Sequence, residues 1–184
     1  MNFKDYYYLT ESFSDNAYIF DLDDTIISTG AKIEVIRDGK KFELTPAQWN
    51  EFKREPGDKI NLGQFDDSNI FFKTAKPTKY FKVIENISNA IKRGASNSYI
   101  YILTARGGKI RNTIYDYLKQ KGIEVRLPEI YTVGDNTTKT IAELKKDVLR
   151  KIRNTHIGNV IFFDDDKKNI ELAKQIPGIK TRLV

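Results

Sequence analysis

Short apolar runs alternate with segments of helical periodicity along most of the chain, and this alternation constrains the fold more than any other feature. The runs that suit buried strands are YIF (18–20), YIYIL (99–103), EIYTV (129–133), VIFF (160–163) and IKTRLV (179–184). Between them, apolar side chains recur every three or four residues at 79–93, 110–118, 141–152 and 167–175. Strands that alternate with helices form a parallel sheet with helices on both faces. We therefore expect a Rossmann-like α/β fold.

The start of the chain lies outside this pattern. Residues 1–16 are polar and aromatic without a clear period, and we expect them to form a loosely held N-terminal arm. They lack the apolar centre of a signal peptide, and no apolar run approaches the roughly 20 residues of a membrane span. We expect a single domain over 17–184, in the cytoplasm and without a membrane partner.

An insertion of about 28–78 follows the first strand. Asp38-Gly39 is a two-residue turn signal between apolar stretches, and it predicts a β-hairpin. Thr45 and Pro46 are typical of the N-cap and first position of a helix, so a short helix should follow. The rest of the insertion, 54–78, contains two prolines and two glycines, and we expect a loop there. The insertion would act as a small flap or minimal cap.

Polar side chains follow three of the predicted strands. Asp21 and Asp23 come after the first strand, Thr104 after YIYIL, and Asp164 and Asp165 after VIFF. Ligands of an open parallel sheet bind beyond the carboxyl ends of its strands, so these side chains should converge at one edge. Buried like charges each cost several kcal/mol unless something positive lies near. We therefore expect a divalent cation among the carboxylates, and with it a phosphate.

The composition restricts which metal this edge can hold. The chain has no cysteine, and His156 is its single histidine. Thiolate sites and sites with several histidines are therefore excluded, and the ligands must be oxygen atoms. Oxygen ligands favour magnesium, calcium or manganese.

Three motifs carry a resemblance to a known family. DLDDT (21–25), ILTAR (102–106) and FFDDD (162–166) occur in the order of the first, second and fourth motifs of the haloacid-dehalogenase superfamily. The resemblance covers about 17–26 and 79–184. In detail the chain is similar to small phage-type phosphatases of that superfamily, which suggests a viral origin. Those phosphatases in turn resemble the 3′-phosphatase domain of polynucleotide kinases.

The resemblance implies a phosphatase mechanism. Asp21 would be the nucleophile that forms an aspartyl-phosphate, and Asp23 would protonate the leaving oxygen and later deprotonate water. Mg²⁺ would be held by Asp21, by the main-chain carbonyl of Asp23 and by Asp164. Asp165 would bind the same ion directly or through water.

The resemblance also assigns groups to the phosphate oxygens. They are Thr104, a lysine of the third motif, and the main chain around Leu22, Asp23 and Ala105. Arg106 would either reach the phosphate or the substrate chain, or form a surface salt bridge.

The lysine of the third motif has to be chosen among several. On a helix over 141–152, Lys145 shares one face with four apolar residues, Ile141, Val148, Leu149 and Ile152. A lysine on an apolar stripe is costly unless an anion lies beside it. We therefore assign the catalytic role to Lys145, with Lys139, Lys146 and Lys151 as the alternatives.

These observations predict a magnesium-dependent phosphomonoesterase. The formal net charge of +6 suits an anionic partner, and a small insertion leaves room for a bulky substrate. The favoured substrate is a nucleic-acid end, with a 3′-phosphate preferred. A nucleotidase or small-metabolite phosphatase is the alternative enzyme. A non-catalytic module that binds phosphate or nucleic acid is the alternative from another class.

Overall fold

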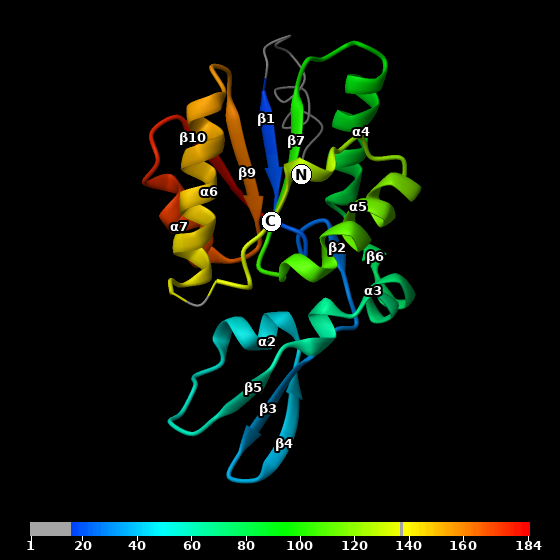
Figure 1. Ribbon diagram of the computed structural model, residues 1–184. Coiled ribbons are helices and arrows are strands. Elements are labelled where there is room, and N and C mark those ends of the chain that lie inside the picture. Colours follow the sequence, from blue (N-terminus) through cyan, green and yellow to red (C-terminus); the bar gives the residue numbers. More distant parts are fainter. Residues whose placement is uncertain (1–15, 137) are drawn as a thin grey trace.

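The computed structural model describes residues 16–136 and 138–184, and a five-stranded parallel sheet forms its centre (Figure 1). The strand order is β10-β9-β1-β7-β8, and every pairing is parallel. The strands are β1 (Ala17–Phe20), β7 (Tyr99–Thr104), β8 (Ile130–Thr132), β9 (Val160–Asp164) and β10 (Ile179–Leu183). Each strand corresponds to one of the predicted apolar runs. The Rossmann-like α/β prediction is confirmed.

Helices cover both faces of this sheet. α4 (Phe81–Lys92) and α5 (Arg111–Gln120) lie on one face, and α6 (Ile141–Thr155) and α7 (Lys167–Lys174) lie on the other (Figure 1). Two short 3₁₀ turns, η2 (Gly108–Ile110) and η3 (Leu127–Glu129), precede α5 and β8. α4 ends at Lys92, and Gly94 follows it at φ +67°, a left-handed conformation that favours glycine at the end of a helix.

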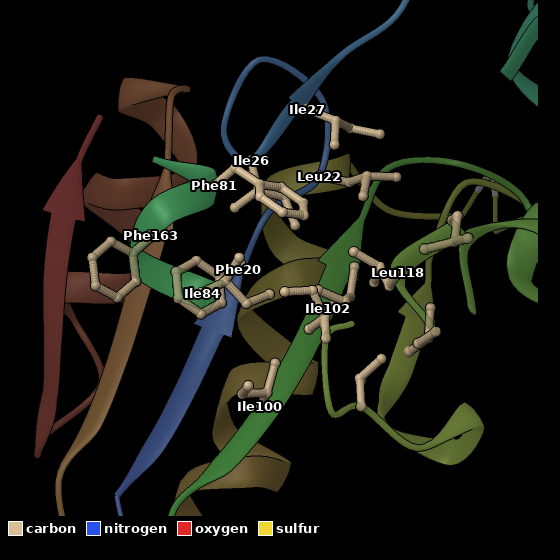
Figure 2. Close-up of a cluster of buried hydrophobic side chains, with 14 of the residues drawn as sticks. Phe20, Leu22, Ile26, Ile27, Phe81, Ile84, Ile100, Ile102, Leu118 and Phe163 are labelled. Atoms are coloured by element: carbon tan, nitrogen blue, oxygen red, sulfur yellow. The ribbon is translucent and has the colours of Figure 1, made fainter. Parts of the chain in front are cut away.

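The core has two layers because side chains alternate along β1. Phe20 points into the layer under α4 and α5, whereas Ile19 points into the layer under α6 and α7. In the first layer the rings of Phe20 and Phe163 stack with centroids 4.7 Å apart (Figure 2). Burying a side chain of this kind contributes about 1.5–3 kcal/mol. These contacts hold β1 and β9 in register.

That register brings the acidic strand ends together. Phe20 pairs with Phe163 on one side and with Ile102 on the other. The main-chain N–H of Asp21 donates to the carbonyl of Phe163 at 2.9 Å. Asp21 and Asp164 are therefore neighbours, each one residue past a paired phenylalanine.

The insertion begins and ends beside the sheet's carboxyl edge. β2 (Ile27–Ser28) and β6 (Lys76–Pro77) form an antiparallel pair that closes its base. Beyond them lie a three-stranded antiparallel sheet and the helix α2 (Pro46–Glu51), below the carboxyl ends of the strands in the view of Figure 1. The strands of this small sheet, in the order β4-β3-β5, are β3 (Ile33–Arg37), β4 (Lys40–Leu44) and β5 (Lys59–Asn61).

The predicted hairpin and helix of the insertion are present. Asp38 and Gly39 have φ values of +50° and +75°, as a tight turn between β3 and β4 requires. Thr45 caps α2, and its side chain accepts a hydrogen bond from the main-chain N–H of Gln48.

The prediction of a loop over 54–78 was wrong. This stretch contains β5, the 3₁₀ turn η1 (Gly63–Asp66), the helix α3 (Ser68–Thr74) and β6. Asp67 caps α3 by accepting from the N–H groups of Asn69 and Ile70. The fully buried ring of Phe71 packs edge to face against Tyr117 of α5, with centroids 5.5 Å apart. Packing against the main domain stabilises a helix that is too short to show a period in the sequence.

Most of the predicted N-terminal arm, residues 1–15, lies outside the described residues. Asn16, its last residue, is buried, and its carbonyl accepts from the main-chain N–H of Tyr99 at 2.8 Å. Its side-chain oxygen accepts from the main chain and side chain of Asn159. Asn16 therefore contacts β7 and the residue before β9. Among the described residues, no helix is both long enough and apolar enough to span a membrane.

Candidate active site

Lys145 lies between two carboxylates at the carboxyl edge of the sheet. Its Nζ donates to Oδ1 of Asp21 at 2.5 Å and to Oδ2 of Asp164 at 2.7 Å. The side chain of Lys145 is 3% exposed, and those of Asp21 and Asp164 are 7% and 0% exposed. The stripe of α6 that faces the sheet contains Leu144, Lys145, Leu149 and Ile152. The sequence pattern predicts a lysine on the apolar face of this helix, and in the structure that lysine contacts the carboxylates of Asp21 and Asp164.

The other lysines that were considered lie elsewhere. Lys139 pairs with Asp147 at 2.6 Å, and Lys146 donates to the side chain of Gln175 at 2.6 Å. Lys151 lies over the ring of Tyr131, 5.6 Å from its centroid. In the described part of the chain, none of these three contacts Asp21 or Asp164 through a hydrogen bond or ion pair.

The site contains more acidic groups than basic ones, and this excess affects the pKa values of Asp21, Asp165 and Lys145. Burial raises the pKa of Asp21 well above its usual value, Lys145 opposes this shift, and Asp164 and Asp165 add to it. Burial and the charge of Asp164 raise the pKa of Asp165 to about 6. Burial alone would lower the pKa of Lys145, but Asp164 and Asp21 together hold it above its usual value. One buried ammonium therefore does not neutralise the carboxylates around it.

Asp164 and Asp165 are held in place by neighbouring polar groups. The Nδ2 of Asn169, in the first turn of α7, lies 3.0 Å from both oxygens of Asp164, and the N–H of Asp166 donates to Oδ1 at 2.8 Å. Thr25, fully buried after β1, donates to Oδ1 of Asp165 at 3.3 Å. Both carboxyl groups are thus held in a fixed orientation by hydrogen bonds.

The donors fit a hard divalent cation. Asp21, Asp164 and Asp165 each offer an oxygen, and these three atoms lie within 4.8 Å of one another. When all three carboxyl groups are ionised, the one ammonium leaves a net charge of −2, which a divalent cation would offset. His156 takes no part, since its Nε2 is bonded to the hydroxyl of Tyr101. Oxygen-only ligation of this kind is typical of magnesium, calcium or manganese.

Asp23 is not part of this three-carboxylate cluster, and its side chain pairs with Arg106. The Nε of Arg106 donates to Oδ2 of Asp23 at 2.8 Å, and its Nη2 donates to Oδ1 at 2.7 Å. The side chain of Arg106 is 1% exposed and that of Asp23 is 16% exposed. The salt bridge that the sequence suggested for Arg106 is therefore buried and lies within the site. A direct contact of Arg106 with phosphate, and the role of the Asp23 carbonyl as a metal ligand, stay predictions.

The remaining predicted phosphate-binding groups lie at the same strand ends. Thr104 is buried at the end of β7, and its hydroxyl accepts from the main-chain N–H of Arg106 at 3.2 Å. Leu22 is fully buried, and its carbonyl anchors the turn after β1 by accepting from the N–H groups of Ile26 and Ile27. Ala105 is exposed.

Sequence reasoning missed several residues of the site. Thr29 and the main chain of Phe65 contact Arg106, but both lie in the insertion and no pattern connects them with the motifs. The contact of Thr25 with Asp165 was also missed, because threonine after an acidic turn is typical of simple capping. Asn169 could have braced the acidic loop after FFDDD, but a position in the first turn of a helix is enough to explain an asparagine, so its contact with Asp164 was not assigned.

The comparisons with known proteins identify no family. The sequence matches no protein-family model and no curated protein. A chain in the "Structure of the Pnkp1/Rnl/Hen1 RNA repair complex" aligns with 11% identity and a TM-score of 0.48, over 95% of this chain and 44% of that one. The chain thus spans less than half the length of that protein. A likeness at this level carries no argument about function.

Proposed function

We propose that the protein is a magnesium-dependent phosphomonoesterase that works through an aspartyl-phosphate. The observation that carries the proposal is Lys145, buried between Asp21 and Asp164 with Asp165 beside them. A nucleophilic carboxylate, a fixed cation and a set of metal ligands are the groups that phosphoryl transfer requires. The resemblance of DLDDT, ILTAR and FFDDD to superfamily motifs supports the same chemistry.

In the first step an oxygen of Asp21 attacks phosphorus, and the bond from phosphorus to the ester oxygen breaks. Asp23 gives its proton to the leaving oxygen, and in the second step it takes a proton from the attacking water. The water oxygen bonds to phosphorus as the bond between phosphorus and the Asp21 oxygen breaks, which releases inorganic phosphate and restores the Asp21 carboxylate. Lys145 offsets charge that develops on the phosphoryl oxygens. Mg²⁺, held by Asp21, Asp164, Asp165 and the Asp23 carbonyl, would let two anions approach each other.

We propose a nucleic-acid end, with a 3′-phosphate preferred, as the substrate. The net charge of +6 favours an anionic polymer, and the insertion of about fifty residues, 28–78, is small for a cap. Lysines and arginines that contact the backbone of a strand would add affinity that a mononucleotide cannot supply. A nucleotidase and a non-catalytic binding module are the competing outcomes.

The substrate proposal predicts a salt-dependent preference. At low salt, kcat/KM should be higher for a 3′-phosphorylated oligonucleotide than for the matching nucleoside 3′-monophosphate. Three backbone contacts to a single strand would lose about 20-fold in affinity when the salt concentration rises fourfold. Hydrolysis of a small aryl phosphate should change much less. The measurement is phosphate release from all three substrates at two salt concentrations.

A 5′-phosphorylated copy of the same oligonucleotide is the matched control, because it carries the same backbone charge. A lower rate for this control supports the 3′-end. If the mononucleotide is an equal or better substrate at low salt, the enzyme is a nucleotidase. If phosphate binds but no ester is hydrolysed, the non-catalytic module takes the place of the enzyme.

A further inference from the structure

The guanidinium of Arg106 joins the predicted acid to the insertion. Besides its two hydrogen bonds to Asp23, Nη2 donates to the hydroxyl of Thr29 at 2.9 Å, and Nη1 donates to the carbonyl of Phe65 at 2.6 Å. The hydroxyl of Thr29 also contacts Oδ1 of Asp23 at 3.3 Å. Arg106 itself follows β7, whereas Thr29 and Phe65 belong to the beginning and the later part of the insertion. One side chain thus links three segments that are distant in sequence.

This guanidinium has little freedom. It lies 4.9 Å from the ring centroid of Phe65 and 5.0 Å from that of Phe71. Four of its five N–H donors are used within the protein, two of them on the two oxygens of Asp23. A planar fork that meets both oxygens of a carboxylate fixes its orientation, which a single ammonium cannot do. Most of the donor capacity of Arg106 is therefore committed to Asp23 and to the insertion.

We infer that Arg106 is a positioning residue for Asp23. Because Arg106 also binds Thr29 and Phe65, the position of the insertion determines how the carboxyl group of Asp23 is oriented. The inference rests on the proposed phosphatase function, because it concerns the group that protonates the leaving oxygen. The inference gives Arg106 a different role from that of the residues that would bind the phosphate. Loss of Arg106 should harm proton transfer more than nucleophilic attack.

Leaving groups that differ in basicity test this separation. p-Nitrophenolate leaves without a proton, whereas the phenolate of phenyl phosphate needs one. The value of kcat/KM for p-nitrophenyl phosphate divided by that for phenyl phosphate therefore reports on proton donation by Asp23. Asp23→Asn should raise this ratio most. Arg106→Lys keeps the charge but loses the fork, and it should raise the ratio about tenfold, since misplacing a catalytic group by 1 Å can cost about 10²-fold. Thr29→Val removes one hydrogen bond and should raise the ratio about threefold.

Arg37→Lys is the matched control. Arg37 makes the same fork to Asp58 within the insertion, with both hydrogen bonds at 2.8 Å. Its other hydrogen bonds among the described residues go to Glu55 and to the carbonyl of Lys53, both also in the insertion. This variant should leave the ratio unchanged. A melting curve of each variant shows whether it folds, and Thr29→Val decides the question if Arg106→Lys does not fold.

Three results would be informative against the inference or its basis. If a folded Arg106→Lys protein loses the same factor for both esters, Arg106 binds phosphate or is merely structural. If Arg106→Lys is unfolded and Thr29→Val leaves the ratio unchanged, the inference also fails. If the wild-type protein hydrolyses neither ester, the proposed function itself is wrong, an outcome distinct from the other two because they require an active wild type.

Discussion

Asp21→Asn is expected to reduce phosphate release by about 10³-fold or more while the protein stays folded. Asparagine keeps the shape of the side chain but lacks the charged oxygen that attacks phosphorus, and removing a covalent nucleophile costs several kcal/mol of transition-state stabilisation. The protein should stay folded, because Asp21 is buried beside other carboxylates that repel it, and its raised pKa shows that its charge is disfavoured there. Removing that charge should therefore cost little stability. The measurements are phosphate release from an aryl phosphate and a melting curve.

Asp24→Asn is the control for this variant. Asp24 lies three residues away at φ +56°, a conformation that asparagine also adopts readily, and no catalytic role is assigned to it. Its activity should stay close to that of the wild type. If Asp21→Asn retains activity within tenfold of the wild type, the covalent mechanism is wrong.

The second large effect concerns Lys145. Lys145→Met should lower kcat by about 10²-fold or more and should destabilise the metal-free protein, because it leaves two buried carboxylates without their cation. Removing one partner of a buried ion pair typically costs about 3–5 kcal/mol. kcat measured with saturating magnesium, and the melting temperature measured with a chelator, report these two effects separately.

Lys146→Met is the matched control on the same helix. Lys146 contacts Gln175 at the surface, so its loss should change stability by no more than about 0.5 kcal/mol and leave turnover intact. Small effects of equal size in both variants would reject the assignment of Lys145. The search for the third-motif lysine would then return to Lys139 and Lys151.

Much of the fold and of the carboxylate cluster followed from local sequence patterns. YIF and VIFF are uniformly apolar because both faces of a parallel sheet are buried, and the acids that end them had to share one edge. Lys145 could be singled out because a charge on an apolar helix face needs a counter-charge, and the structure places Asp21 and Asp164 there.

The contacts of the insertion could not be predicted in the same way. α3 is stabilised by packing of Phe71 on Tyr117, which is a tertiary contact without a local signal. The pairing of Arg106 with Thr29 spans 77 positions, and that with Phe65 spans 41. Such contacts depend on where the insertion folds relative to β7, and a single sequence does not encode this position in any short pattern.

The most direct test of the central claim is phosphate release by protein that has been stripped of divalent cations, before and after magnesium is added. The site predicts no release from an aryl phosphate with a chelator present and recovery when magnesium is restored, because the charges of Asp21, Asp164 and Asp165 then have their counter-ion. Asp165→Asn should need more magnesium for half-maximal release. Release that is indifferent to the chelator, or absent at every magnesium concentration, would contradict the account.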